Sequence, residues 1–230
     1  MAYSTTYDYA PTIGELALNA FGRCGLRRTE LTQQHLADAA NEANLVQVEF
    51  SNRIPNLWLA ETYDVSLTSG TATYALLARL IAPMAVYMTV QATSGDLFDR
   101  ILMPISTYDY ESLPNKTQSG QPTTYWFDRQ ITPNITLWPV PDNSATYTLH
   151  LRMISQPQDA TIPNGIQPQV PYRFFDAFTA ALAWRLAVIY APDKAPMLGA
   201  MAERAWDIAA NNDTEMTPIV VSPMIGGYYR

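Results

Sequence analysis

The sequence predicts an α+β fold: a four-helix domain, built from two N-terminal and two C-terminal helices, with a β-rich domain inserted between them. Two observations predict it. Apolar residues recur at helical spacing near both ends of the chain, and they alternate at strand spacing in the middle. Runs of strands between runs of helices are typical of α+β architecture. The expected boundaries are 1–55 for the N-terminal helical part, 56–156 for the β-rich domain, 157–213 for the C-terminal helical pair and 214–230 for an extended tail.

The N-terminal helices are predicted from capping signals. Thr12 and Glu15 have the spacing of a capping box, in which each side chain satisfies the other residue's backbone amide. Gly22 and Gly25 indicate the end of this helix, and Thr29 is expected to cap a second, longer helix that ends before Pro55. The predicted apolar face of the second helix comprises Leu36, Ala39, Ala40, Ala43, Val46 and Phe50.

Alternating apolar residues predict β structure from residue 57 onward. The expected strands lie within 57–67, 84–90, 101–105, 123–128, 135–138 and 147–153, separated by clusters of Pro, Asn, Asp and Ser. Pro104 places the 101–105 strand at an edge or a strand end. Ser106 is expected to cap a short helical turn, and a proline-punctuated connector over 157–171 leads back to the helices.

The C-terminal pair is predicted as two helices joined at residues 190–193. Pro192 stops the first helix, and Asp193 is expected to cap the second. The predicted apolar stripes are Phe175, Phe178, Leu182, Leu186 and Ile189 in the first helix and Leu198, Met201, Ala205 and Ile208 in the second. Because alanines surround the first stripe, a neighbouring backbone can approach closely. We therefore interpret Ala180, Ala183 and Ala187 as candidate contacts between subunits.

Composition restricts the function classes. The chain has 230 residues and a formal net charge of −7, which argues against a protein that grips nucleic acid, because phosphate binding needs clustered Lys and Arg. Cys24 is the single cysteine, so an intramolecular disulfide is excluded and folding in a reducing cytoplasm is expected. There is no basic-then-apolar leader, and no apolar run approaches the roughly 20 residues of a membrane span. We expect a soluble protein with no membrane partner.

The sequence offers little catalytic chemistry. His35 and His150 have no second His or Cys at ligand spacing, so no metal site is expected. Asp109 and Glu111 are two residues apart in a predicted helix and point away from each other. Nucleotide-binding loops and a nucleophile elbow are absent from the sequence. A Ser-His-Asp triad stays open, because its members need not be adjacent, but we expect no catalytic residues and no cofactor.

Two clusters have alternative interpretations. Arg23, Arg27 and Arg28 lie between the first two predicted helices, where they either stabilise a helix end or pair with an acidic neighbouring subunit. Tyr125, Trp126, Phe127 and Trp138 are either a sugar-stacking platform or, as we favour, strand core and interface anchors. The platform gives the alternative function, a carbohydrate- or receptor-binding β-module of a virion or cell surface.

Three segments in order carry a family resemblance: Leu113–Arg129, Ile135–Asp142 and Tyr147–Arg152, followed by the closing pair with Leu182–Ala187 before Tyr190-Ala-Pro192. Over about residues 12–218 the pattern resembles the head-to-tail adaptors of tailed bacteriophages, of the tail tubular protein A type. The resemblance implies a non-enzymatic structural protein of the virion neck, made in the cytoplasm of the bacterial host. It also implies a homo-oligomeric ring, dodecameric in the family, through whose lumen DNA passes without specific binding.

The resemblance further implies partners. They are the portal protein above the ring and the tail nozzle or distal tail tube protein below it, with attachment of tail fibres to the β-rich domain left open. Carried onto this chain, residues 217–230 become the portal-docking tail, and the helices around 36–50 and 175–208 become the belt between subunits. Arg27 and Arg28, from the pairing interpretation of their cluster, are candidate interface residues together with the three alanines. The apolar tail residues expected to dock are Pro218, Ile219, Val220, Val221, Pro223, Met224, Ile225, Tyr228 and Tyr229.

Overall fold

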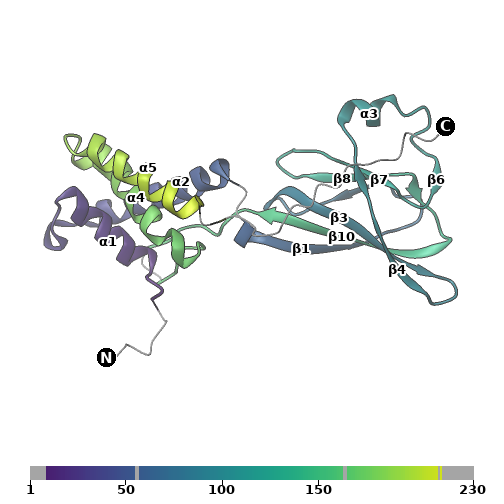
Figure 1. The fold of residues 1–230 in the computed structure, drawn as a ribbon, viewed down its shortest axis with the longest axis horizontal. Coiled ribbons are helices and arrows are strands. Elements are labelled where there is room, and N and C mark those ends of the chain that lie inside the picture. Colours follow the sequence, from purple (N-terminus) through teal and green to yellow (C-terminus); the bar gives the residue numbers. More distant parts are fainter. Residues whose placement is uncertain (1–8, 55–56, 163–164, 212, 214–230) are drawn as a thin grey trace, which may run out of the picture. The chain divides into compact units, whose positions relative to one another are not determined.

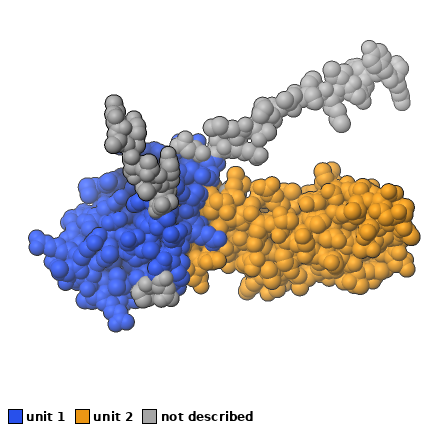
Figure 2. Space-filling view, turned by 90° about the horizontal axis from the view of Figure 1, so that it is seen from below, with its two compact units in different colours: residues 1–46, 160–230 blue, residues 47–159 orange. Residues whose placement is uncertain are grey.

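A computed structural model describes residues 9–54, 57–162, 165–211 and 213 of the chain. The fold is α+β, with helices at both ends and a β-rich middle, so the predicted class is confirmed (Figure 1). The chain divides into two compact units, coloured separately in Figure 2. Residues 1–46 and 160–230 form the helical unit, and residues 47–159 form the β-rich unit.

In the helical unit, α4 lies between α1 and α5 and packs against both (Figure 1). The elements of this unit are α1 (Ile13–Cys24), η1 (Arg28–Glu30), η3 (Tyr172–Phe174), α4 (Phe175–Tyr190) and α5 (Ala195–Asn211), and α2 (Gln33–Arg53) begins in it and continues into the next unit. Because α4 is covered on two sides, its sequence is apolar almost all round, as a buried helix requires. The largest fully buried side chains here are Phe21, Phe174 and Phe178.

Local sequence signals explain where α1 begins and ends. The Thr12 hydroxyl accepts a hydrogen bond from the Glu15 amide, and the Glu15 carboxylate accepts one from the Thr12 amide, so the predicted capping box is present. Gly25 ends the helix with φ of 94°, a conformation that favours glycine. The prediction that Thr29 caps α2 is wrong. It lies in η1, whose extra turn delays the start of α2 to Gln33.

Two predicted helical faces differ from the observed ones. On α5 the buried residues are Leu198, Ala202, Trp206 and Ala209, whereas Met201 and Ile208 are exposed. The physical reason is Trp206, whose ring packs on Phe174 with centroids 5.6 Å apart. This contact fixes the rotation of α5, so that Ala202 and Ala209, each about one turn from Trp206, also face inward. On α4, Phe178, Leu182 and Leu186 of the predicted stripe are buried, whereas Phe175 is partly buried and Ile189 is exposed.

The β-rich unit is built from two four-stranded sheets. One has the order β1-β10-β3-β4 and is antiparallel throughout, and the other has the order β2-β8-β7-β5, with β5 and β7 parallel. The strands are β1 (Ala60–Ser66), β2 (Thr73–Ala75), β3 (Leu80–Ala92), β4 (Leu97–Ile101), β5 (Met103–Pro104), β7 (Thr124–Phe127), β8 (Asn134–Trp138) and β10 (Ala145–Ser155). Two short strands, β6 (Ser119–Gly120) and β9 (Val140–Pro141), form a separate parallel pair.

One core joins the two sheets. It takes alternate residues from β3 and β10 and meets Tyr125, Ile135 and Leu137 of the second sheet. The predicted strand over 101–105 is instead two strands, because Leu102 turns into this core between β4 and β5. The turn before β1 is η2 (Leu57–Leu59), and the predicted short helix is α3 (Thr107–Ser112), capped by Ser106 as expected.

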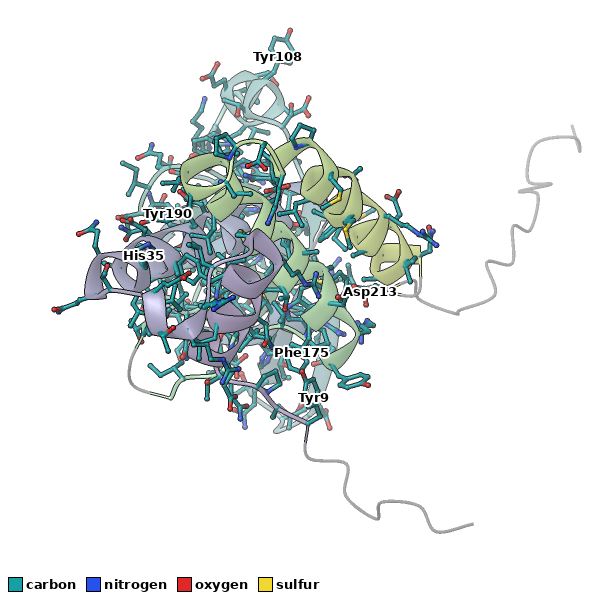
Figure 3. The ribbon with its side chains drawn as sticks, turned by 90° about the vertical axis from the view of Figure 1, so that its left-hand side faces the viewer. Tyr9, His35, Tyr108, Phe175, Tyr190 and Asp213 are labelled. Carbon is teal, nitrogen blue, oxygen red and sulfur yellow. The ribbon has the colours of Figure 1, made fainter. Side chains whose placement is uncertain are left out.

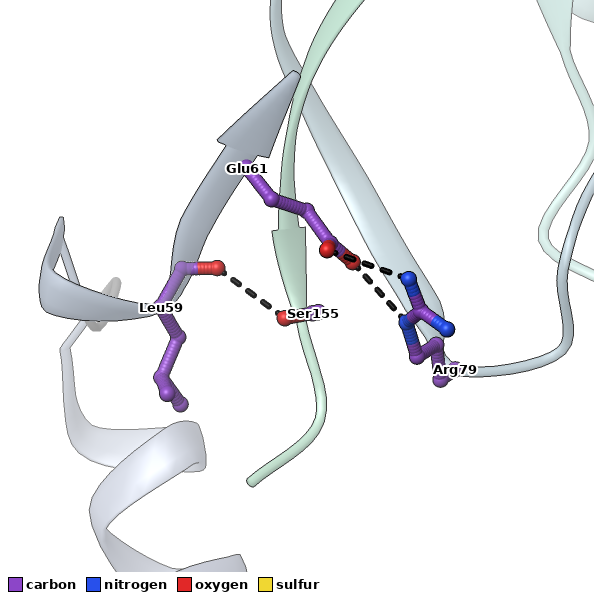
Figure 4. Close-up of polar contacts among 4 residues, drawn as sticks. All are labelled: Leu59, Glu61, Arg79 and Ser155. Atoms are coloured by element: carbon purple, nitrogen blue, oxygen red, sulfur yellow. Dashed lines mark hydrogen bonds and ion pairs between the residues drawn. The ribbon is translucent and has the colours of Figure 1, made fainter. Parts of the chain in front are cut away.

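Polar contacts hold the ends of β1, β3 and β10 together (Figure 4). The Ser155 hydroxyl donates to the Leu59 carbonyl at 3.0 Å. Nearby, the Arg79 guanidinium donates to both carboxylate oxygens of Glu61, at 2.9 and 3.1 Å. These bonds fix the register where the chain enters and leaves the β-rich unit.

Candidate functional site

The alanines predicted as subunit contacts are buried inside the helical unit itself. Ala180, Ala183 and Ala187 are 3%, 0% and 0% exposed. The carbonyl of Ala183 accepts a hydrogen bond from the Cys24 thiol at 3.3 Å, which shows how closely α1 approaches α4 at this point. The small side chains therefore serve the packing of α1 and α5 on α4 within one chain, and their assignment to a subunit interface is corrected.

Exposed apolar side chains lie elsewhere on the same two helices. Met197 and Met201 are one turn apart on α5 and are 57% and 49% exposed. At the end of α4, Val188 and Ile189 are similarly exposed, and so is Ile208 on α5. The predicted apolar stripe placed Met201 in the core. The sequence signal that it missed is Trp206, a larger apolar residue on the opposite side of the helix, which is buried in place of Met201.

The arginine cluster separates into different roles. Arg23 pairs with Asp176 of α4 at 2.8 Å, so it joins two helices of one chain. Arg27 and Arg28 are exposed around η1, where the Arg27 amide donates to the Glu30 carboxylate at 2.9 Å. For these two residues, a contact with a neighbouring subunit stays a prediction.

A hollow of about 640 Å³ lies on the surface of the helical unit. Its aromatic wall is formed by Tyr9, Tyr172 and Phe175, which meet edge to face with centroids 6.1 to 6.3 Å apart. Figure 3 shows Tyr9 and Phe175 close together. Arg173 also lines the hollow and pairs with Asp213, just beyond the end of α5. Arg23 and Asp176, which pair with each other, also line the hollow, so it offers aromatic and charged contacts.

The contacts of His35 in the helical unit are structural. His35 stacks on Tyr190 with centroids 4.6 Å apart, and the two residues lie together in Figure 3. The Tyr190 hydroxyl donates to Asp38, and this bond, with burial, raises the pKa of Tyr190 to about 12. His35 accepts from the Thr32 amide at 3.1 Å. The group ties α2 to the end of α4.

Cys24 is buried, and burial raises the pKa of its thiol, so it is held in the unreactive protonated form. Its own carbonyl accepts a hydrogen bond from the Lys194 ammonium at 2.8 Å. This bond joins the end of α1 to the turn between α4 and α5. The cysteine acts as a packing residue.

In the β-rich unit, His150 lies in a polar row that crosses all four strands of the antiparallel sheet. Its Nδ1 is 2.6 Å from Asp64 of β1, and its Nε2 is 3.0 Å from the hydroxyl of Thr89 on β3. The spacing is that of an acid–histidine–hydroxyl triad. However, the Thr89 hydroxyl donates to Asp99 of β4 at 2.6 Å, so its proton is directed to a carboxylate instead of the imidazole. The row therefore links strands instead of activating a nucleophile.

The aromatic set does not form a joint sugar platform. Tyr125 is in the core, on the opposite face of β7 from Trp126. Trp126 stacks on Tyr110 of α3 with centroids 5.0 Å apart and donates to Thr107, and Trp138 donates to the Asn115 carbonyl at 3.0 Å. The chain's own α3 and the loop after it thus engage both indoles. This arrangement corrects the platform interpretation.

The predicted portal-docking residues, from Pro218 to Tyr229, lie outside the described residues. Within the part of the chain that the structure describes, no group of three or more His, Cys, Asp or Glu side chains is arranged to hold a metal ion. Among the same residues, no helix is long and apolar enough to cross a membrane.

Comparison with known proteins gives one family. The family model of the SU10 adaptor protein matches residues 11–222, which include the β-rich unit and most of the helical unit. A search of curated proteins gave no match.

Proposed function

The chain belongs to the SU10 adaptor protein family, a family of phage structural adaptors of the virion, and from this premise we propose that it forms a ring between the portal and the tail. The observation that carries the proposal is the extent of the match: residues 11–222 include the helices at both ends and the inserted β-rich unit. The match thus covers every helix of the helical unit as well as the β-rich unit. We propose a ring of twelve copies, as in the tail tubular protein A type that the sequence resembles.

The ring role assigns partners to different parts of the chain. The portal protein contacts the C-terminal segment of the chain, residues 217–230. The tail nozzle or distal tail tube protein binds on the opposite side of the ring. DNA passes through the lumen without being held, since a chain with a net charge of −7 gives phosphates few cations to bind. No step of this role needs catalysis.

Each copy in a closed ring needs two different surfaces, because head-to-tail contacts join unlike faces. We assign Met197 and Met201 to one of them. Both side chains are about half exposed, and methionine adapts its shape to a partner surface. Arg27 and Arg28 are assigned to the other, where they set the partner's register through charge more than they add affinity.

The proposal is tested by mixing the purified chain with the portal protein of the same virion and imaging the particles by negative-stain electron microscopy. We expect an added ring on one end of the portal. The double variant Met197→Glu, Met201→Glu should fold but not assemble, while Ile131→Glu, which also places a charge at an exposed apolar site, should assemble normally. Unchanged portal particles with the unmodified chain would refute the adaptor ring; assembly of the methionine variant would refute only the assigned surface.

A further inference from the structure

The antiparallel sheet of the β-rich unit ends in two edge strands, β1 and β4, and both are visible at its sides in Figure 1. An edge strand presents backbone N–H and C=O groups that its own sheet does not use, and another chain can pair with them. Proteins usually protect such edges with charged or polar side chains. The two edges of this sheet differ in that respect.

The register shows which backbone groups of β4 point away from the sheet. The Leu102 amide donates to the Val86 carbonyl at 3.1 Å, and the Ala92 amide donates to the Asp96 carbonyl at 2.9 Å. Because bonded and non-bonded pairs alternate along an antiparallel ladder, Phe98 and Arg100 are the β4 residues that bond to β3. The backbone groups of Leu97, Asp99 and Ile101 therefore point outward.

The edge formed by β1 carries polar side chains, as its register shows. The Leu67 amide donates to the Tyr147 carbonyl at 3.0 Å, so the backbone groups of Thr62, Asp64 and Ser66 point outward there. All three side chains are exposed and polar. This edge carries the usual protection.

The β4 edge carries apolar side chains where β1 carries polar ones. Leu97 and Ile101 are 67% and 76% exposed, and they lie on one face of the strand with Asp99 between them. Met103 continues the exposed apolar row into β5 at 65%. In the described residues, no backbone bond is made by the outward groups of Leu97, Asp99 or Ile101.

The charge of this face selects the partner. The Asp99 carboxylate accepts a hydrogen bond from the Thr89 hydroxyl, which separates it from His150, and Asp64 lies at the other end of the same row. Arg100 points to the opposite face by the alternation of the strand. A residue that pairs opposite Asp99 is therefore favoured when it is basic and opposed when it is acidic.

We propose that the β4 edge accepts an added strand from a protein partner. The partner segment is extended, has apolar residues at alternate positions that cover Leu97 and Ile101, and has a Lys or Arg between them that faces Asp99. Its main chain bonds to the three outward residues of β4, and its side chains give the specificity, as in other cases of strand addition. The inference goes beyond the adaptor role and does not depend on it.

The test uses the full chain and a fluorescein-labelled, end-blocked nonapeptide with valines at alternate positions and a central lysine, followed by fluorescence anisotropy. We expect saturable binding. A peptide with a central glutamate should bind at least tenfold more weakly, and so should the lysine peptide with N-methyl groups at its bonding amides. Equal binding of the N-methylated peptide, or none by the lysine peptide at millimolar concentration, would overturn the proposal.

Variants locate the site. Ile101→Lys and, independently, Leu97→Lys should weaken binding at least tenfold, because each puts a repelling charge at an exposed position. The matched variant Ser66→Lys on the β1 edge should bind within twofold of the unmodified chain. Circular dichroism checks that each variant is folded. Equal losses of peptide binding from variants at both edges would overturn the proposal and indicate non-specific attraction. Dimers of the chain in sedimentation experiments, if Ile101→Lys abolishes them, would instead assign the β4 edge to a second copy of the chain.

Discussion

Replacement of Ala183 by glutamate tests the burial of the alanine face of α4. Ala183 is 0% exposed, and its carbonyl lies 3.3 Å from the Cys24 sulfur, so the new side chain has no route to water. Burial can raise the pKa of a carboxyl group by roughly 3 to 5 units. A buried glutamate, whose ordinary pKa is about 4.3, therefore takes up a proton at pH 7, and at about 1.4 kcal/mol per unit between these two values the uptake costs about 3 to 4 kcal/mol. Overpacking adds about 1 to 3 kcal/mol. Together they approach the total stability of a typical domain, about 5 to 15 kcal/mol.

The measurement is urea denaturation of Ala183→Glu followed by far-ultraviolet circular dichroism. We expect the helical signal to be largely lost without denaturant. The matched control is Val188→Glu, on the same helix but 58% exposed, which should change the free energy of unfolding by no more than about 0.5 kcal/mol. An Ala183→Glu protein with an unchanged midpoint would refute the assignment of this face to the interior and restore it as a free surface.

Further predictions concern local bonds and DNA. Because the pKa of Tyr190 is raised to about 12, the hydrogen bond of its hydroxyl stabilises the folded state fully below the ordinary tyrosine pKa of about 10. This contribution to stability should fall as the pH rises from about 10 to 12. Ultraviolet titration should show a lower pKa of Tyr190 in the variant Asp38→Asn. Thr12→Ala removes one side of the capping box and should cost about 1 kcal/mol in chemical denaturation; no change would mean that the cap is not formed in solution. In gel-shift assays at physiological salt, the chain should bind duplex DNA no better than serum albumin, and a clear shift would contradict a lumen that lets DNA slide.

The helices and caps could be predicted because their signals are local. Thr12 with Glu15 and Ser106 with Asp109 bring together residues three apart, so each capping box can be recognised without knowledge of the rest of the fold. The apolar alternation of β3 and β10 is also local. Together these patterns were sufficient for the α+β class.

Features that depend on distant partners could not be predicted. Which side of α5 is buried depends on Trp206 meeting Phe174, and periodicity alone allows either Met201 or Ala202 to face inward. The alanines of α4 indicate close packing, but the sequence does not say whether the neighbour is the same chain or another. The division of one predicted strand into β4 and β5 depends on a second sheet that draws Leu102 into the core.

In the proposed function, copies of this chain close into a ring on the portal. The most direct measurement is the mass of the portal complex formed with excess chain, by native mass spectrometry. We expect an increase of twelve chain masses, each of 25.7 kDa, in one cooperative step. A portal whose mass does not change, or chains that add singly without reaching a closed number, would contradict it.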